Sequence, residues 1–219
     1  TTSWNPPNVD KWKDKTFLGY HRADGQVGTG NVWLFFPLVF CENKNIERLR
    51  EVFEELVPKK ADSYKQLLRS LISNTTQDFN QTTTVEKPTF DNIEVKFITH
   101  QGGCGGIRQD SESLARLLAG YVNNPNVAGA TVLSLGCQNL QSQDFLNDLK
   151  ERNPNFSKPL FIYEQQQSQS EEQLISDAIK QTFLGLIEAN KIERKPAPIT
   201  ELVLGVKCGG SDGFSGTSF

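Results

Sequence analysis

Apolar residues follow two alternating patterns along the chain. Short, nearly continuous apolar runs cover residues 31–41, 93–99, 130–135, 160–163 and 201–207. Continuous rather than alternating apolar runs are typical of strands that are covered on both faces, as in parallel sheets. Between them, apolar residues recur at helical spacing, which predicts helices over 45–57, 61–72, 111–122, 143–152 and 171–191.

The order of these elements predicts the fold class. From residue 92 onward strands and helices alternate, which requires right-handed crossovers and a parallel sheet flanked by helices. We therefore predict an α/β fold with a mostly parallel, Rossmann-like sheet. Pro37, inside the first apolar run, predicts an edge strand or a bulge. Ser170 is placed to cap the last long helix.

Polar segments suggest how the chain is divided. Residues 1–16 are polar without periodicity and predict a linker from an upstream domain, whereas residues 17–219 form the α/β domain. The segment 73–91 is rich in Thr, Asn and Gln, and predicts an exposed loop or a subdomain boundary. The chain has no methionine and ends in a glycine- and serine-rich segment. We expect it to be a fragment, truncated at its C-terminus.

Composition excludes several classes of partner. The formal net charge is -3, and basic residues are interspersed with acidic ones, so no basic stripe is available for nucleic acid. No apolar run approaches the roughly 20 residues that span a bilayer. We therefore expect a cytoplasmic protein that binds neither nucleic acid nor membranes.

The four cysteines occupy similar places in the pattern. Each lies at or just past the end of an apolar run: Cys41, Cys104, Cys137 and Cys208. If these runs are parallel strands, the four thiols lie along the one edge of the sheet where open α/β sheets bind ligands. Reduced thiols are favoured over disulfides, because a strand–helix repeat is unlike small disulfide-stapled domains.

The segment around Cys104 concentrates candidate chemistry. His100 and Cys104 are four residues apart, both just beyond an apolar run, and Gly103 and Gly105 flank the cysteine. Glycine allows positive φ angles and close approach of a ligand, and the amides of such a turn can hold an anion. The alternative is a tight turn with a buried thiol. The recurrence of the strand–cysteine–turn pattern favours a functional site.

Thiolate and imidazole ligands suit iron or zinc. Candidate metal ligands are therefore His100, Cys104, Cys137 and Cys208. A three-cysteine iron–sulfur cluster with one open iron, acting as a Lewis acid, is an alternative. For Cys41 we favour a buried thiol that closes a core strand.

Two further polar pairs are candidates. Arginine's planar fork suits carboxylates, so Arg22 beside His21 is a candidate for holding an acidic sugar, although a surface arginine is favoured on sequence alone. Ser211 and Asp212 follow Cys208 closely, which favours function over a simple turn. The glycine-rich segments match neither a Walker A nor a G-x-G-x-x-G pattern, so no nucleotide is predicted.

Several segments carry a more specific pattern. They are Gly19-Tyr-His-Arg-Ala-Asp-Gly-Gln-Val-Gly-Thr-Gly-Asn31, His100-Gln-Gly-Gly-Cys-Gly105, Leu118-Ala-Gly-Tyr-Val122 with Pro125-Asn126, Leu135-Gly-Cys137, and Leu204-Gly-Val-Lys-Cys-Gly-Gly-Ser-Asp-Gly-Phe-Ser-Gly216. From about residue 17 to the end, the chain closely resembles the altronate and galactarate dehydratase family. One departure is Gly30, where the family usually has arginine.

The resemblance implies a bacterial, Fe2+-dependent hydro-lyase that converts a hexonate or hexarate to a 2-keto-3-deoxy acid; Mn2+ or an iron–sulfur cluster are alternatives. It also implies further domains on both sides and, we expect, a homo-oligomer. Expected catalytic residues are His100, Cys104, Ser211 and Asp212. Expected substrate-binding residues are His21, Arg22, Gly103, Gly105, Lys207, Gly209 and Gly210.

In the implied reaction, the metal polarises the departing hydroxyl while a base, which the sequence does not identify, removes the proton next to the carboxylate. Two other hypotheses remain. One is a lyase for another hydroxy acid, such as a sulfonated one. The other is a non-catalytic binding or assembly domain with four structural thiols.

Overall fold

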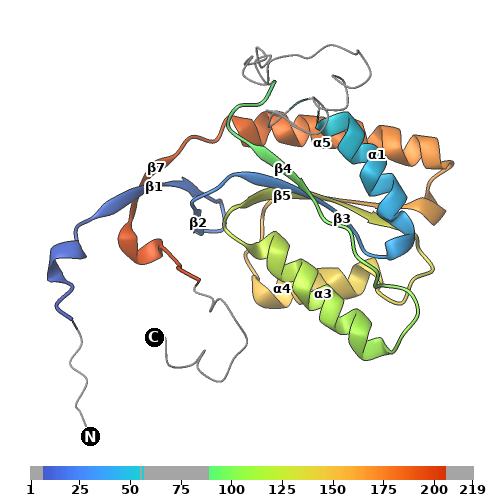
Figure 1. Cartoon of the computed structure of the whole chain (residues 1–219), viewed down its shortest axis with the longest axis horizontal. Helices are drawn as coiled ribbons and strands as arrows, with labels where there is room; N and C mark the ends of the chain where they lie inside the picture. Colours follow the sequence, from blue (N-terminus) through green and yellow to red (C-terminus); the bar gives the residue numbers. More distant parts are fainter. Residues whose placement is uncertain (1–6, 55, 57–88, 206–219) are drawn as a thin grey trace, which may run out of the picture.

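The computed structural model describes residues 7–54, 56 and 89–205, and its centre is a four-stranded parallel sheet (Figure 1). The strands lie in the order β4 (Glu94–Phe97), β3 (Val32–Pro37), β5 (Val127–Ser134) and β6 (Leu160–Glu164), and each neighbouring pair is parallel. The predicted α/β class, with a parallel sheet flanked by helices, is confirmed.

Helices cover both faces of this sheet (Figure 1). One face packs against α1 (Asn43–Phe53) and α5 (Glu171–Asn190), and the other against α3 (Arg108–Asn123) and α4 (Ser142–Arg152). The predicted positions of these four helices are confirmed to within a few residues. Ser170 caps α5 as predicted, because its side chain accepts a hydrogen bond from the backbone N–H of Gln173.

The continuous apolar run of β3 is explained by this two-sided burial. Trp33 and Phe35 pack into the core under α1 and α5, whereas Leu34 and Phe36 pack into the core under α3 and α4. All four side chains are at most 5% exposed. β3 therefore contributes to both cores, and burial of each large apolar side chain stabilises the fold by about 1.5–3 kcal/mol.

Trp33 also determines how closely α5 approaches the sheet. A Cβ at Gly129 of β5 would lie 2.5 Å from the Trp33 ring, and one at Gly185 of α5 would lie 2.3 Å from it. The indole Nε1 donates to Thr131 Oγ1 at 3.0 Å. The two glycines therefore provide the space for the indole between β5 and α5.

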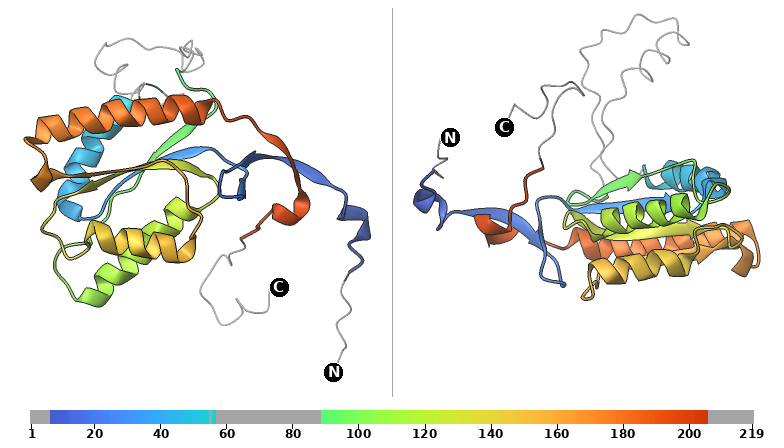
Figure 2. Two further views of the ribbon diagram at one scale, coloured as in Figure 1. Left: turned by 180° about the vertical axis from the view of Figure 1, so that it is seen from behind. Right: turned by 90° about the horizontal axis from the view of Figure 1, so that it is seen from below.

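A small antiparallel sheet projects from the main body (Figures 1 and 2). Its strands lie in the order β2 (Val27–Gly28), β1 (Thr16–His21) and β7 (Lys195–Pro198). The described residues also form four short 3-10 segments: η1 (Asp10–Trp12), η2 (Phe40–Glu42), η3 (Gln165–Gln167) and η4 (Ile199–Glu201). Nowhere in the described ranges is a helix both long and apolar enough to cross a bilayer.

The predicted strand over 201–207 is wrong in its described part. Residues 202–205 form no strand, and Leu202, Val203 and Leu204 are 46%, 89% and 82% exposed. β7, which precedes this run in the sequence, pairs with β1 and does not join the parallel sheet. Among the described strands, the apolar run therefore finds no sheet neighbour to bury it. The predicted helix over 61–72, and all but the last residues of the predicted loop 73–91, lie outside the described residues.

The prediction that Pro37 marks an edge strand or a bulge is also wrong. β3 lies inside the sheet, and its register shift falls between Val32 and Trp33. Pro37 is the last residue of β3, and the pairing with β4 has already ended at Phe35. Because no β4 partner faces Pro37, its missing N–H interrupts no ladder.

Candidate functional site

The strand order creates a change of direction at the carboxyl edge of the parallel sheet. The chain leaves β3 toward α1 on one face, and it leaves β5 toward α4 on the other face (Figure 1). Ligands of open α/β sheets bind at such switch points, beyond the carboxyl ends of the strands. The functional site is therefore expected where the loops after β3 and β5 diverge.

The loop between β4 and α3 occupies this switch point. The carbonyl of Gly103 accepts hydrogen bonds from the N–H groups of Asn139 and Leu140 at 2.9 and 3.2 Å, in the loop after β5. The carbonyl of Gly102 accepts from the N–H of Phe40 at 3.0 Å, in the segment after β3. Three strand-end loops are thus joined by backbone hydrogen bonds.

Gly103 is the tightest point of this junction. Its φ angle is 92°, and a Cβ there would lie 2.1 Å from the carbonyl oxygen of Leu38. Gly105 has a φ angle of 72°, with no atom within 4 Å of an added Cβ. The prediction of positive φ angles on both sides of Cys104 is confirmed. The backbone of Gly103 is buried, whereas Cys104 is exposed beside it.

His100 anchors the start of the same loop. Its Nδ1 accepts from the backbone N–H of Gly102 at 3.2 Å, so Nε2 carries the proton and donates to the Pro37 carbonyl at 2.7 Å. Asn43 of α1 donates from Nδ2 to the His100 carbonyl at 2.8 Å. Both ring nitrogens of His100 are therefore engaged within the protein in this arrangement.

Three free thiols are exposed after successive strands. Cys41, Cys104 and Cys137 follow β3, β4 and β5, respectively, and all three side chains are exposed. The prediction that Cys41 is buried and closes the strand is wrong, because β3 ends at Pro37 and Cys41 lies in the 3-10 segment η2. The tight turn around Cys104 is present, but its thiol is not buried.

The predicted metal ligands are only partly described. Within residues 7–54, 56 and 89–205, no three His, Cys, Asp or Glu side chains are grouped so that they could hold a metal ion. The fourth candidate ligand, Cys208, lies outside the described residues, as do Lys207, Gly209, Gly210, Ser211 and Asp212. Two of the candidate thiol ligands, Cys104 and Cys137, lie in the described part. They are on the two loops that the Gly103 carbonyl connects.

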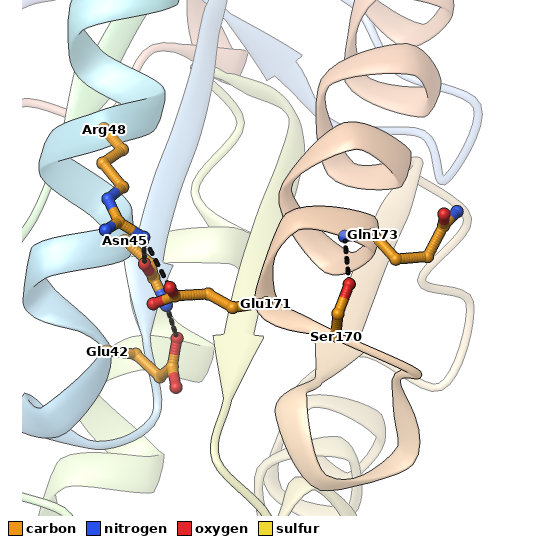
Figure 3. A network of polar contacts seen from close by, with 6 residues as sticks. All are labelled: Glu42, Asn45, Arg48, Ser170, Glu171 and Gln173. Carbon is orange, nitrogen blue, oxygen red and sulfur yellow. Dashed lines mark hydrogen bonds and ion pairs between the residues drawn. The ribbon is translucent and has the colours of Figure 1, made fainter.

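A buried carboxylate lies next to this edge on the α1 and α5 face (Figure 3). Glu42 is 1% exposed, burial raises the pKa of its carboxyl, and Asn45 donates to its Oε2 at 2.8 Å. Arg48 donates to Asn45 Oδ1 at 3.0 Å and pairs with Glu171 Oε2 at 2.9 Å. The hydrogen bond from Arg48 lowers the pKa of Glu171. This network ties α1 to the start of α5, and no sequence motif signals it.

Arg22 lies at the opposite, amino edge of the sheet. It is 7% exposed, so the prediction of a surface arginine is wrong. Its Nε donates to the Pro125 carbonyl at 2.9 Å, and its two terminal nitrogens donate to Asn31 Oδ1 at 3.0 Å and to the Gly30 carbonyl at 2.9 Å. Burial lowers the pKa of Arg22. The guanidinium is used to join the segments that enter β3 and β5.

His21 is also distant from the carboxyl edge, at the end of β1. Its Nε2 lies 3.3 Å from the Pro196 carbonyl. Its side chain lines a hollow of about 330 Å³ together with Lys191, Ile192, Glu193 and Lys195. Within the described part of the chain, His21 and Arg22 do not share a site with His100 and the exposed thiols.

A larger groove that sequence reasoning missed lies beside the loop after β5. Its volume is about 640 Å³, and it runs between the first turns of α3 and α4. The residues that line it are Arg108, Ser111, Glu112, Ala115, Arg116, Asn139, Leu140, Asp144, Asn147 and Asp148. These residues form no recognisable motif. Polar positions on amphipathic helices ordinarily face solvent, so nothing in the sequence distinguishes these positions from an ordinary exposed face.

A comparison with family models identifies one that covers most of the chain. The model described as "D-galactarate dehydratase/Altronate hydrolase, second domain" matches residues 19–190. The matched segment begins in β1 and ends at the last residue of α5, so it includes the complete parallel sheet.

Curated relatives carry related names. An altronate dehydratase from Bacillus subtilis is 28% identical over 207 residues, and one from Escherichia coli is 27% identical over 203 residues. A galactarate dehydratase (L-threo-forming) from Escherichia coli is 26% identical over 208 residues. Each alignment covers 93% of this chain but 34% of the relative. No solved structure matches the chain.

Proposed function

The chain belongs to the D-galactarate dehydratase/altronate hydrolase family, and from this membership we propose that it serves an enzyme that removes water from a sugar acid. The observation that carries the proposal is the match of the second-domain family model to residues 19–190. The names of the relatives, altronate and galactarate dehydratases, support a hexonate or hexarate as substrate and a 2-keto-3-deoxy acid as product. The chain spans about a third of the length of these relatives, 34% in each case.

The proposed reaction is demanding for a protein without strong charge stabilisation. Removal of a proton next to a carboxylate places charge on the carboxylate oxygens, and stabilisation of such charge is usually the largest catalytic term. General acid–base work contributes roughly 10²–10⁴-fold more. Bound ferrous iron would supply a Lewis acid for the departing hydroxyl group.

Donor chemistry supports iron, with different roles for the predicted ligands. Cys104 and Cys137 are exposed thiols on joined loops, and thiolates suit iron. We propose these two, with Cys208, as ligands. His100 fits less well, because both ring nitrogens already take part in hydrogen bonds. We propose that His100 holds the Cys104 loop in position through these two bonds.

The sheet topology supports a finer description of the fold. Counted in chain order, the parallel strands lie in the order 2-1-3-4, which is the start of a flavodoxin-like, doubly wound sheet. We infer that the domain is Rossmann-like in this sense. Its carboxyl edge then suits a small-molecule site at the switch point, where Cys104 lies.

Metal analysis and a substrate screen test this proposal together. The protein, as its host makes it, is purified without oxygen, analysed for iron, manganese and sulfide, and then supplied with hexonates, hexarates and a sulfonated hydroxy acid. We expect close to one equivalent of iron and formation of a 2-keto-3-deoxy product. Turnover of the sulfonated acid alone would refute the proposed sugar-acid substrate. An active enzyme with less than about a tenth of an equivalent of any metal would refute the proposed role of the metal.

Matched cysteine variants assign the roles of the thiols. Cys104→Ala, Cys137→Ala and Cys208→Ala are each expected to lower turnover by at least about 10²-fold and to reduce bound iron, as loss of metal chemistry requires. Cys41→Ala is the control, because its thiol is also exposed, and it should retain turnover within about twofold. Wild-type turnover in the first three variants would show that the ligands are misassigned.

A further inference from the structure

The groove between α3 and α4 begins where both helices begin. Arg108 is the first residue of α3, and Asp144 lies in the first turn of α4. Neither helix has a side-chain cap at its N-terminus. Helix N-termini leave N–H groups without intrahelical partners and favour negative charge. One end of the groove is therefore suited to an anionic group.

A buried hydroxyl beside the same groove has no hydrogen-bond partner in the described part of the chain. Ser111 is 5% exposed, and among the described residues its Oγ is the buried side-chain polar atom that makes no hydrogen bond. Ser111 lines the groove. Buried polar groups are nearly always hydrogen-bonded, and leaving one unpaired is unfavourable. A ligand group that displaces the atoms covering this hydroxyl would supply the missing hydrogen bond.

The charged side chains around the groove are also largely unused. Arg108 pairs with Glu112 at 3.1 Å, but within the described ranges no ion pair or side-chain hydrogen bond engages Arg116, Asp144 or Asp148. Arginine only donates hydrogen bonds, and ionised aspartate only accepts them. A simple anion would pair with the arginine but would be repelled by the aspartates. A simple cation would pair with the aspartates but would be repelled by the arginine.

A polyhydroxylated carboxylic acid satisfies both requirements. Its carboxylate can accept from Arg116, and its hydroxyl groups can donate to Asp144 and Asp148. Ser111 and Asn139 provide further groups that both donate and accept. A volume of about 640 Å³ is within the usual range for small-molecule sites. We propose that the groove between α3 and α4 binds a small polyhydroxylated carboxylic acid.

The location connects this groove to the thiol loops. Asn139 lines the groove, and its backbone N–H donates to Gly103, the neighbour of Cys104. Asn139 also follows Cys137 by two residues. The inference rests on the proposed function for the class of ligand, a sugar acid. It adds which residues hold this acid, and it places them on the α3 and α4 face of the switch point.

Binding without turnover tests the inference. D-galactarate and D-gluconate are titrated into the isotope-labelled chain, and amide chemical shifts and calorimetry report the binding site and Kd. We expect the largest shifts at Ser111, Asn139 and Asp148. Arg116→Gln should raise Kd at least about tenfold, since it removes a charged hydrogen bond. Ser111→Ala should raise Kd by about threefold, and Asp148→Asn by about three- to tenfold.

Controls separate binding in the groove from damage to the fold. Arg116 is exposed, so its replacement leaves the cores intact. Lys180→Gln, an exposed charge change on α5 at the other face, should leave Kd unchanged. The inference is overturned if neither acid shifts the groove amides, if Arg116→Gln binds like the wild type, or if amino acids bind in place of both sugar acids.

These outcomes are distinct from failure of the proposed function. Sugar-acid turnover with unaltered KM in Arg116→Gln would overturn the groove assignment and leave the dehydratase proposal standing. Binding in the groove by a protein that dehydrates none of the acids tested would support the groove and refute the dehydratase proposal.

Discussion

The two edges of the parallel sheet use polar side chains in opposite ways. At the amino edge, Arg22 is buried and its three nitrogens donate to the segments that enter β3 and β5. At the carboxyl edge, Cys41, Cys104 and Cys137 are exposed and free. The difference indicates that the amino edge is joined by a buried side chain, whereas the carboxyl edge is joined by backbone hydrogen bonds and leaves its thiols exposed.

Helix direction explains much of this contrast. α3 ends at the amino edge, where the carbonyls of Val122, Asn123 and Asn124 accept hydrogen bonds from Lys158 at 3.2, 3.2 and 2.7 Å. These carbonyls are all bonded to one side chain, so Lys158 joins the end of α3 to the segment that enters β6. α3 and α4 begin at the carboxyl edge, where their free amides instead suit an anionic ligand.

The largest expected effect concerns the carboxyl edge. Gly103→Ala should destabilise the protein by about 3 kcal/mol, because alanine is strained at positive φ and its Cβ collides with the Leu38 carbonyl. Gly105→Ala, at positive φ but in open space, should cost about 1 kcal/mol. Urea denaturation of both variants measures the difference. Equal effects would contradict the idea that Gly103 locks the three loops together.

A somewhat smaller effect is expected at the amino edge. Arg22→Gln should cost about 2–3 kcal/mol, because the Pro125 and Gly30 carbonyls lose a charged donor. Arg108→Gln, which removes a guanidinium with an 89% exposed side chain, should change stability by at most about 0.5 kcal/mol. Denaturation gives both values. If folded Arg22→Gln also failed to bind sugar acids, the functional division between the two edges would be wrong.

The smallest effect is a pH dependence at the amino edge. Burial lowers the pKa of Lys158 to about 8, so between pH 8 and 10.5 the unfolded chain holds a proton that the folded protein has lost. Stability therefore rises with pH in this window. From pH 7.5 to 9.5, we expect the unfolding free energy of the wild type to rise by roughly 1–2 kcal/mol relative to that of Lys158→Met. A constant difference would show that Lys158 titrates normally.

The pattern of apolar residues predicted most of the central architecture. β3 and β5 are continuous apolar runs, and α1, α3, α4 and α5 show helical spacing, because burial on one or two faces is a local property of each segment. The run at 202–204 shows where this reasoning fails. It has the composition of a strand, but no strand in the described part of the chain pairs with it.

Candidate site residues were harder to interpret than elements. The sequence correctly indicated that Cys41, Cys104 and Cys137 follow strands, and that glycines beside Cys104 adopt positive φ. It misplaced Arg22 and Cys41, because the exposure of a single polar or small side chain depends on which distant segment faces it. The groove around Ser111 had no signal at all.

The sequence by itself determined the strands of the parallel sheet, the four long helices and the family, since these depend on local spacing and on motifs that neighbouring residues share. Only the tertiary structure decided that Gly103 meets Asn139, that Arg22 meets Pro125, and that Ser111 is buried without a partner among the described residues. Such pairings follow from strand order and from the face on which each helix packs. These are long-range choices that no single stretch of sequence encodes.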